Sequence, residues 1–171
     1  QSAPCFIEDM PVLIPFGVDQ DPHFRITRDI APKINKPKPA LIHNIMIPAL
    51  GGPKGKMSAS NENETIYTTD SPEVVRKKIN KYAFSGGQPD IEEHRKKGGN
   101  PDIDVSYQYL KIFFEPDDKK LEQIHDDYKS GKMLTGELKE ILIEKINQFL
   151  TSHQQKREKA KDELDKFLLK D

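Results

Sequence analysis

The C-terminal stretch from residue 137 to 171 contains neither glycine nor proline, the two residues that most often end or kink a helix. Apolar side chains recur within it at the three- and four-residue spacing that places them on one face of a helix. These residues are Leu138, Leu142, Ile146, Phe149, Leu150, Ala160, Leu164 and Phe167. We therefore expect one long helix at this end of the chain.

Shorter helices are predicted between residue 67 and this terminal helix. One begins after Ser71, a good N-cap before Pro72, and others begin near Asp90 and Asp104. The Asp104 helix should stop at Pro116, and a fourth helix is expected after it that ends near Gly131. The core-facing residues are Val75, Ile79 and Tyr82 in the first helix and Leu121, Ile124 and Tyr128 in the fourth. Residues 67–171 are therefore expected to form an all-helical domain.

The N-terminal part shows a different pattern, which is typical of an α/β fold. An apolar run over residues 12–16 predicts a strand buried on both faces in a parallel sheet. A helix is expected after it, with Asp21 as its N-cap, and Pro32 should end or kink that helix. A second strand over residues 40–42 would complete a βαβ unit. Residues 1–66 are therefore expected to be the α/β part of the chain.

Charge and cysteine content narrow the kinds of site that the chain can hold. With 27 basic and 28 acidic side chains the net charge is -1, so an RNA contact needs a local basic face. Such a face is predicted on the helix after Ser71, although a solvated surface is the alternative. The single cysteine, Cys5, excludes an internal disulfide and a cysteine-based zinc site, and the five histidines show no metal-binding spacing. No apolar stretch is long enough to span a bilayer.

The loop "ALGGPKGKMSAS" at residues 49–60 carries the most specific chemistry. Its glycines free the backbone, Lys54 and Lys56 add positive charge, and Ser58 and Ser60 supply hydroxyl groups. Such a loop suits an anion that appears during a reaction, such as pyrophosphate leaving a nucleotide. The spacing is not that of a Walker loop. The alternative is a surface turn rich in glycine and lysine.

A second polar segment, "GVDQD" at residues 17–21, follows the first predicted strand. Its side chains are expected at the carboxyl end of that strand, where open α/β sheets bind ligands. Asp19 offers an acceptor for ribose hydroxyls, and Gln20 offers a neutral amide for the polar end of an amino acid. Capping of the following helix is the alternative for Asp19 and Asp21.

These segments resemble class I aminoacyl-tRNA synthetases. "KMSAS" is similar to the KMSKS loop of that class, and Ala59 in place of the second lysine is similar to the eukaryotic-type tryptophanyl branch. The resemblance implies that Lys56 is catalytic and stabilises the pyrophosphate leaving ATP, with Met57, Ser58 and Ser60 shaping the ATP site. The departure at Ala59 removes one phosphate contact that other members make.

The resemblance also implies substrate contacts. In the tyrosyl and tryptophanyl branch the counterpart of Asp19 faces the ATP ribose and that of Gln20 faces the amino acid. "QSAP" at residues 1–4 resembles a stretch whose glutamine contacts the substrate, which makes Gln1 a second substrate-binding candidate.

The stretch "KYAFSGGQPDIEEHR" at residues 81–95 resembles the helical domain that binds the tRNA anticodon in this family. An exposed Phe84 could stack on an unpaired base, glycines allow close approach, and carboxylates accept from base amino groups. The predicted tRNA-binding residues are Phe84, Ser85, Gly86, Gly87, Asp90 and Glu92. Pro89 stands where the family often has an acid. The alternative is a helix-connecting turn with Phe84 in the core.

Class I synthetases pair the lysine loop with an upstream HIGH-type motif, and no H-x-G-H pattern occurs in this chain. We therefore interpret the chain as the C-terminal portion of a longer polypeptide. The resemblance implies that residues 1–66 end a Rossmann-type parallel-sheet catalytic domain and that residues 67–171 form its anticodon-binding domain.

The implied function is that of a tryptophan–tRNA ligase, which activates tryptophan with ATP and Mg²⁺ and transfers it to tRNA(Trp). The resemblance further implies a cytoplasmic homodimer without a membrane segment, and we expect this chain alone to be inactive. A tyrosyl-type synthetase shares the Asp–Gln pair and the lysine loop and is one alternative. A non-catalytic RNA-binding or signalling fragment is the other.

Overall fold

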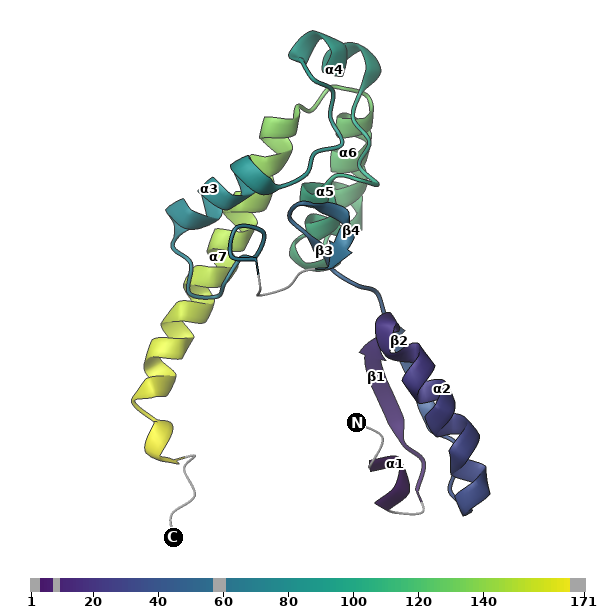
Figure 1. Ribbon diagram of the computed structural model, residues 1–171. Helices are drawn as coiled ribbons and strands as arrows, with labels where there is room; N and C mark the ends of the chain where they lie inside the picture. The colour runs from purple at the N-terminus through teal and green to yellow at the C-terminus, as the bar shows by residue number, and fades with distance from the viewer. Residues whose placement is uncertain (1–3, 8–9, 57–60, 167–171) are drawn as a thin grey trace. The chain divides into compact units, whose positions relative to one another are not determined.

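The computed structural model describes residues 4–7, 10–56 and 61–166 of the chain (Figure 1). These residues form two compact units that divide between Ile47 and Pro48. The boundary therefore precedes the glycine and lysine loop, whereas the sequence predicted a boundary after residue 66. The functional assignment of the two parts stays a prediction.

The first unit is a βαβ arrangement, purple in Figure 1. Its elements are α1 (Pro4–Ile7), β1 (Leu13–Gly17), η1 (Val18–Gln20), α2 (Asp21–Ile30), η2 (Ala31–Ile34) and β2 (Ala40–Asn44). β1 and β2 pair in parallel, with Leu13 opposite Ala40 and Gly17 opposite Asn44. This confirms the predicted strand, helix, strand order. The α-helix ends at Ile30, two residues before Pro32, as expected for a residue that lacks an amide donor.

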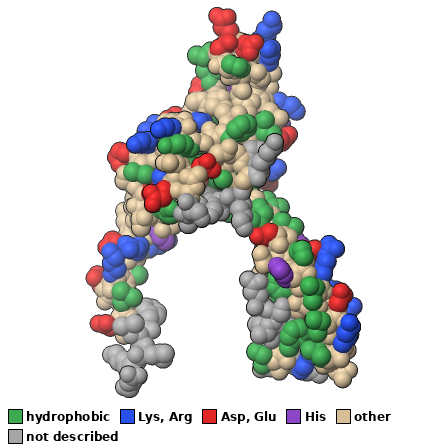
Figure 2. Space-filling model, in the orientation of Figure 1, with side chains coloured by type: hydrophobic (Ala, Val, Ile, Leu, Met, Phe, Trp, Pro, Cys, Tyr) green, Lys and Arg blue, Asp and Glu red, His purple; other side chains and the backbone are tan. Residues whose placement is uncertain are grey.

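The predicted burial of the first strand on both faces is wrong in the described unit. Phe16 is buried against Phe24 of α2, with ring centroids 4.6 Å apart, but Leu13 is 59% exposed. Two strands and one helix within the unit cannot cover both faces of the sheet. Further isoleucines on α2 and η2, namely Ile26, Ile30 and Ile34, are also exposed, and hydrophobic side chains gather on the surface of this unit (Figure 2).

The second unit begins with a short antiparallel hairpin and continues as helices. The hairpin consists of β3 (Pro48–Ala49) and β4 (Gly52–Lys56). The helical elements are α3 (Pro72–Tyr82), α4 (Ile91–Lys97), α5 (Val105–Tyr109), the π-helix η3 (Leu110–Phe114), α6 (Asp118–Lys129), α7 (Thr135–Lys161) and the short η4 (Leu164–Lys166). The predicted helices are thus confirmed, except that the terminal one ends at Lys161, and Phe167 lies outside the described residues.

The helix starts follow the capping residues that the sequence offers. The Ser71 side chain accepts from the Val74 amide, and Asp90 accepts from the Glu93 amide. Gly98 ends α4 with φ at +73°, a conformation that glycine adopts without strain. These local signals account for the accuracy of the predicted boundaries.

The long helix α7 forms the spine of the core, with α3 packed along it (Figure 1). Its buried residues are Leu138, Leu142, Ile143, Ile146 and Leu150. Val75 and Ile79 of α3 are fully buried. Phe149 and Leu164 match the helical period but are 54% and 55% exposed, so the predicted apolar face extends further than the packed face. None of the helices within the described ranges is long and apolar enough to cross a membrane.

A buried carboxylate joins the end of η3 to α6 and α7. Glu115 lies 3.1 Å from Lys145 Nζ and 3.3 Å from Lys120 Nζ, and its side chain is 3% exposed. Burial by itself raises the pKa of Glu115, but hydrogen bonds from Lys145 and the Asp117 amide outweigh burial and hold the pKa below its ordinary value. Glu115 therefore stabilises the fold in its charged form.

Replacing Glu115 with glutamine is expected to lower the free energy of unfolding by about 1 kcal/mol at pH 7, because the ion pairs are lost. Since the folded-state pKa is lowered, the contribution is full above the unfolded-state pKa and is lost as the pH falls through the folded one. The difference between the two proteins in denaturant titrations should therefore begin to shrink below the ordinary glutamate pKa of about 4.3 and vanish only below the lowered folded-state pKa. Glu122→Gln on the exposed face of α6 is the control. A difference that persists unchanged in acid would contradict this explanation.

Candidate functional site

The residues predicted to bind a nucleotide ribose and an amino acid follow β1 directly. Asp19 and Gln20 lie in η1, immediately after the carboxyl end of the strand at Gly17. The Asp19 carboxylate lies over Gly17, because a Cβ added to that glycine would be 2.8 Å from Asp19 Oδ1. Asp19 is exposed and Gln20 is half-buried. The strand end is thus followed by a carboxylate and an amide on consecutive residues.

Asp21 does not cap α2, so the predicted capping role is wrong. Gln20 occupies the N-cap position without a side-chain hydrogen bond, and Asp21 is the first helical residue. The Asp21 carboxylate instead accepts hydrogen bonds from His43 Nε2, at 2.7 Å, and from Arg25 Nε. The His43 hydrogen bond is the larger cause of a lowered pKa of Asp21, and Arg25 adds to it.

His43 could not be recognised as part of this region from the sequence, because its hydrogen-bond partner, Asp21, lies 22 residues away in the chain. The parallel register places it opposite Phe16, and its ring contacts the Phe16 ring at 4.7 Å. The Asp21–His43 bond ties the start of α2 to β2, beside Asp19 and Gln20. Only the pairing of the two strands could have revealed it.

The lysine loop emerges from the β3–β4 hairpin of the second unit. Lys56 is the last residue of β4. Met57, Ser58 and Ser60 lie outside the described residues, as does Gln1, so their roles stay predictions. The start of the hairpin is held by Tyr109, whose hydroxyl donates to the Pro48 carbonyl at 2.7 Å. The loop is therefore attached to a helical core.

The chain that returns from the loop is held by Lys78 of α3. Its ammonium donates to the Thr65 carbonyl at 2.8 Å and to Asp70 at 2.7 Å, and it lies 4.7 Å from the centroid of the Tyr67 ring. Lys78 was predicted as part of a basic face, but its side chain is only 12% exposed. Arg76 of the same face pairs with Glu140. Lys78 therefore serves packing within the unit, whereas Arg76 forms an exposed ion pair.

The turn after α3, predicted to contact tRNA, is built around a buried hydrogen-bond network. Ser85 Oγ lies 3.3 Å from the Tyr128 hydroxyl and 3.2 Å from Thr135 Oγ1. Tyr128 donates to Asp104 at 2.7 Å, and Asp104 also accepts from the Gly86 amide. Burial and then the Asp104 charge raise the pKa of Tyr128 to about 12, so its hydroxyl keeps the proton that it donates.

The two glycines of the turn are required by packing. A Cβ on Gly86 would lie 2.0 Å from the Asn100 carbonyl oxygen, and one on Gly87 would lie 2.3 Å from Thr135 Oγ1. Gly86 is buried and Gly87 is half-buried. These contacts account for both glycines without a bound RNA, and RNA contact by them stays a prediction.

Gly86→Ala is expected to lower the free energy of unfolding by about 3 kcal/mol, because the new methyl group meets a backbone carbonyl that cannot move freely. Gly136, near the start of α7, has nothing within 4 Å of an added Cβ. Gly136→Ala should therefore stabilise the chain by about 0.5 kcal/mol through helix propensity. Thermal unfolding of both variants measures this difference. Equal effects of the two alanines would contradict the packing explanation.

The other predicted RNA contacts are more accessible. Phe84 is 42% exposed, so the alternative of a core phenylalanine is not what the structure shows. Glu92 is exposed on α4, and the exposed Asp90 caps that helix through the Glu93 amide at 2.8 Å. Phe84, Asp90 and Glu92 can therefore be reached from solvent.

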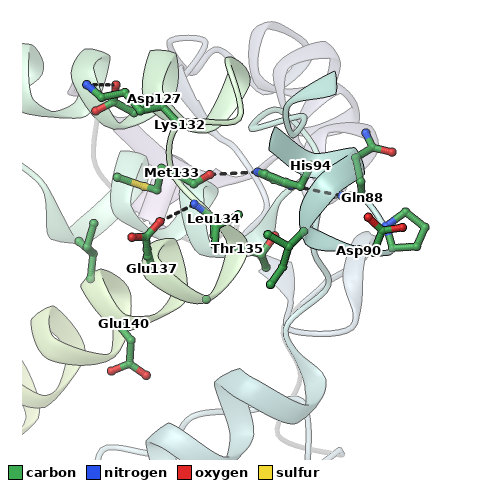
Figure 3. A pocket seen from close by; sticks show the side chains of 14 residues that line it. Gln88, Asp90, His94, Asp127, Lys132, Met133, Leu134, Thr135, Glu137 and Glu140 are labelled. Atoms are coloured by element: carbon green, nitrogen blue, oxygen red, sulfur yellow. Dashed lines mark hydrogen bonds and ion pairs between the residues drawn. The ribbon is translucent and has the colours of Figure 1, made fainter. Parts of the chain in front are cut away.

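An open groove of about 930 Å³ lies between the start of α4 and the start of α7 (Figure 3). Its charged side chains are mainly acidic, with one lysine: Asp90, Asp127, Glu137, Glu140 and Lys132. Lys132 is 3.0 Å from Asp127, which neutralises one of the carboxylates. An acidic groove disfavours phosphate but suits the amino groups of nucleic-acid bases.

His94 forms the floor that connects both sides of this groove, and the sequence did not single it out. Its Nε2 donates to the Met133 carbonyl at 3.0 Å, and its Nδ1 accepts from the Gln88 amide at 3.3 Å (Figure 3). A carbonyl can only accept and an amide can only donate, so the ring is the Nε2–H tautomer. His94 is 3% exposed and fixes the turn against the segment before α7.

Comparison with known proteins shows which family this chain resembles. Residues 5–151 match the family model of tRNA synthetases class I (W and Y). The chain is 60% identical over 161 residues to a tryptophan–tRNA ligase of Sulfurisphaera tokodaii, covering 94% of this chain and 42% of that protein. It is 51% identical over 174 residues to the cytoplasmic tryptophan–tRNA ligase of Homo sapiens, covering 96% of this chain and 37% of that protein.

Among solved structures, a product-bound parasite tRNA synthetase aligns with a TM-score of 0.86 and 47% identity over 92% of this chain and 44% of that one. The chain thus spans about two fifths of the length of these relatives. The likeness confirms a class I synthetase fold that mixes helices with a parallel strand pair. This chain belongs to the class I tRNA synthetases of the tryptophan and tyrosine family.

Proposed function

We propose that this chain is the C-terminal portion of a tryptophan–tRNA ligase. The full-length protein would join tryptophan to ATP, release pyrophosphate and transfer the activated amino acid to tRNA(Trp). The observation that carries the proposal is the identity of 60% and 51% to two proteins named tryptophan–tRNA ligase, over nearly the whole of this chain.

In the activation step, the residues of the two units would have different roles. Asp19 would accept hydrogen bonds from the ATP ribose, and Gln20 would bind the polar end of tryptophan, with Gln1 as a second contact. Their place directly after β1 supports this assignment, since ligands of open α/β sheets bind at the carboxyl ends of strands. Residues 1–66 would then belong to a Rossmann-type catalytic domain.

Lys56 would neutralise the charge on the departing pyrophosphate. An interaction that is stronger in the transition state than with bound ATP raises the rate of the chemical step. Met57, Ser58 and Ser60 would shape the same phosphate site. Mg²⁺ would enter with ATP as part of the substrate. Within residues 4–7, 10–56 and 61–166, no cluster of three His, Cys, Asp or Glu side chains is placed to hold a metal ion.

Residues 67–171 would bind the anticodon of tRNA(Trp). The exposed ring of Phe84 is available for stacking on a base, and the carboxylates of Asp90 and Glu92 are available to base amino groups. Ser85, Gly86 and Gly87 would contribute through the shape of the turn. A homodimer in the cytoplasm completes the proposal, and the human relative is named cytoplasmic.

The proposal is tested by amino-acid-dependent exchange of pyrophosphate into ATP with the full-length protein. Exchange with tryptophan and none with tyrosine is expected, and the reverse would assign a tyrosyl-type synthetase. The 171-residue chain alone should show no exchange. If the full-length protein exchanges with neither amino acid but this chain binds tRNA, a non-catalytic RNA-binding role replaces the proposal.

A further inference from the structure

The backbone of Phe84 connects the turn after α3 to the hairpin that carries Lys56. The Phe84 amide donates to the Leu50 carbonyl at 2.7 Å, and the Phe84 carbonyl accepts from the Val105 amide at 3.2 Å. Leu50 is fully buried. One residue of the turn therefore links the hairpin to the start of α5.

The Phe84 side chain makes a second contact with the same hairpin. Its Cγ, Cβ and Cδ2 atoms lie 3.6 to 3.7 Å from the position of a Cβ added to Gly52. Gly52 is buried and has φ at +137°, a conformation that residues with a side chain rarely adopt. The ring thus covers a backbone position of β4 that carries no side chain of its own.

Phe84 and Gly52 together line a groove of about 490 Å³ with Ala49, Gly51, Gly55, Glu64 and Ile103, and Phe84 is 42% exposed. The same side chain is therefore in contact with the hairpin and open to solvent. Further hydrogen bonds hold the start of the hairpin and the chain that returns from the lysine loop. Tyr109 holds Pro48, the Leu50 amide donates to the Glu64 carbonyl at 3.4 Å, and Lys78 holds Thr65. Unlike these contacts, the Phe84 ring packs on β4, at Gly52, which is four residues before Lys56.

We propose that Phe84 is a positioning residue for the activation step. Its ring on Gly52 and its amide on Leu50 hold the β3–β4 hairpin in the place from which Lys56 acts. This inference rests on the function proposed above and adds to it, because it assigns to a residue of the RNA-binding turn an effect on a step that needs no RNA. A displacement of a catalytic group by about 1 Å is enough to cost up to 100-fold in rate.

The test is tryptophan-dependent pyrophosphate exchange by the full-length protein in the absence of tRNA. Phe84→Leu keeps an apolar side chain and the backbone hydrogen bond but removes the flat ring over Gly52. We expect kcat to fall about tenfold, with the KM for tryptophan nearly unchanged. Phe84→Tyr keeps the ring and should therefore have the same kcat as the wild-type protein. Phe84→Met serves as the second variant where Phe84→Leu does not fold.

Phe149→Leu is the matched control, because Phe149 is a similarly exposed phenylalanine that packs on Phe114 and His153, away from the hairpin. Phe149→Leu should catalyse pyrophosphate exchange at the wild-type rate. If Phe84 acts only on RNA, exchange is unchanged in Phe84→Leu and only the KM for tRNA in aminoacylation rises, which overturns the proposal. Loss of rate in Phe84→Tyr as well would also overturn it.

A wild-type protein without any exchange would instead refute the proposed function. The contact itself is then judged by hydrogen–deuterium exchange of the 171-residue chain. Backbone amides of residues 49–52 and 54–56 should exchange about tenfold faster in Phe84→Leu than in Phe149→Leu, because the hairpin loses its cover. Equal exchange in the two variants would show that the ring does not hold the hairpin.

Discussion

Lys56→Ala in the full-length protein is expected to slow the formation of tryptophanyl-adenylate about 100-fold, the usual cost of losing one group that stabilises transition-state charge. In the proposed role the lysine acts on pyrophosphate as it leaves, so the KM for tryptophan should change little. Single-turnover measurements of adenylate formation separate this effect from product release.

Lys54→Ala is the matched control, because it removes the same charge two residues earlier on the same strand, β4. If general positive charge in the loop were sufficient, both variants would lose activity equally. An unchanged activation rate in Lys56→Ala would remove this residue from its proposed role. A raised KM for tryptophan with an unchanged kcat would point instead to ground-state binding.

Asp104→Ala is expected to cause the largest loss of stability, about 3 to 5 kcal/mol, because several buried donors lose their acceptor at once. The Asp104 carboxylate is fully buried and accepts from the amides of Ser106, at 2.9 Å, and Tyr107, at 3.4 Å, at the start of α5. It also accepts from Gly86 and Tyr128. The melting temperature should fall by roughly 15 °C.

The neighbouring Asp102 is exposed, and Asp102→Ala should leave the melting temperature nearly unchanged. Asp104→Asn is expected to lie between the two alanine variants, since the amide keeps one acceptor oxygen but places donors opposite donors. A melting temperature of Asp104→Ala equal to that of Asp102→Ala would show that the network contributes nothing to stability.

The helices of the second unit could be predicted because their signals are local. Ser71, Asp90 and Gly98 mark helix ends through hydrogen bonds and backbone angles within a few residues. The apolar period of α7 likewise predicts which side is buried, but not how far along the helix a partner extends. Phe149 is exposed for that reason, since burial needs a neighbour that the sequence of α7 does not contain.

The candidate site was predictable only in part. The Asp–Gln pair after β1 and the lysine loop were visible as short motifs. The bonds that hold them were not, because Asp21 meets His43 across 22 residues and Tyr109 meets Pro48 across 61. Contacts of this length follow from the packing of whole elements, and no spacing in the sequence reports them.

The sequence alone determined the order of the elements, the helix ends and the identity of the chemical groups. Each of these depends on residues that are close together in the chain. Tertiary structure decided what surrounds those groups. It buried Asp104 and His94, left Leu13 exposed, and attached the hairpin that carries Lys56 to the helical unit through Phe84. The physical reason is that burial and long-range hydrogen bonds depend on which surfaces meet, and that is determined by the packing of all elements together.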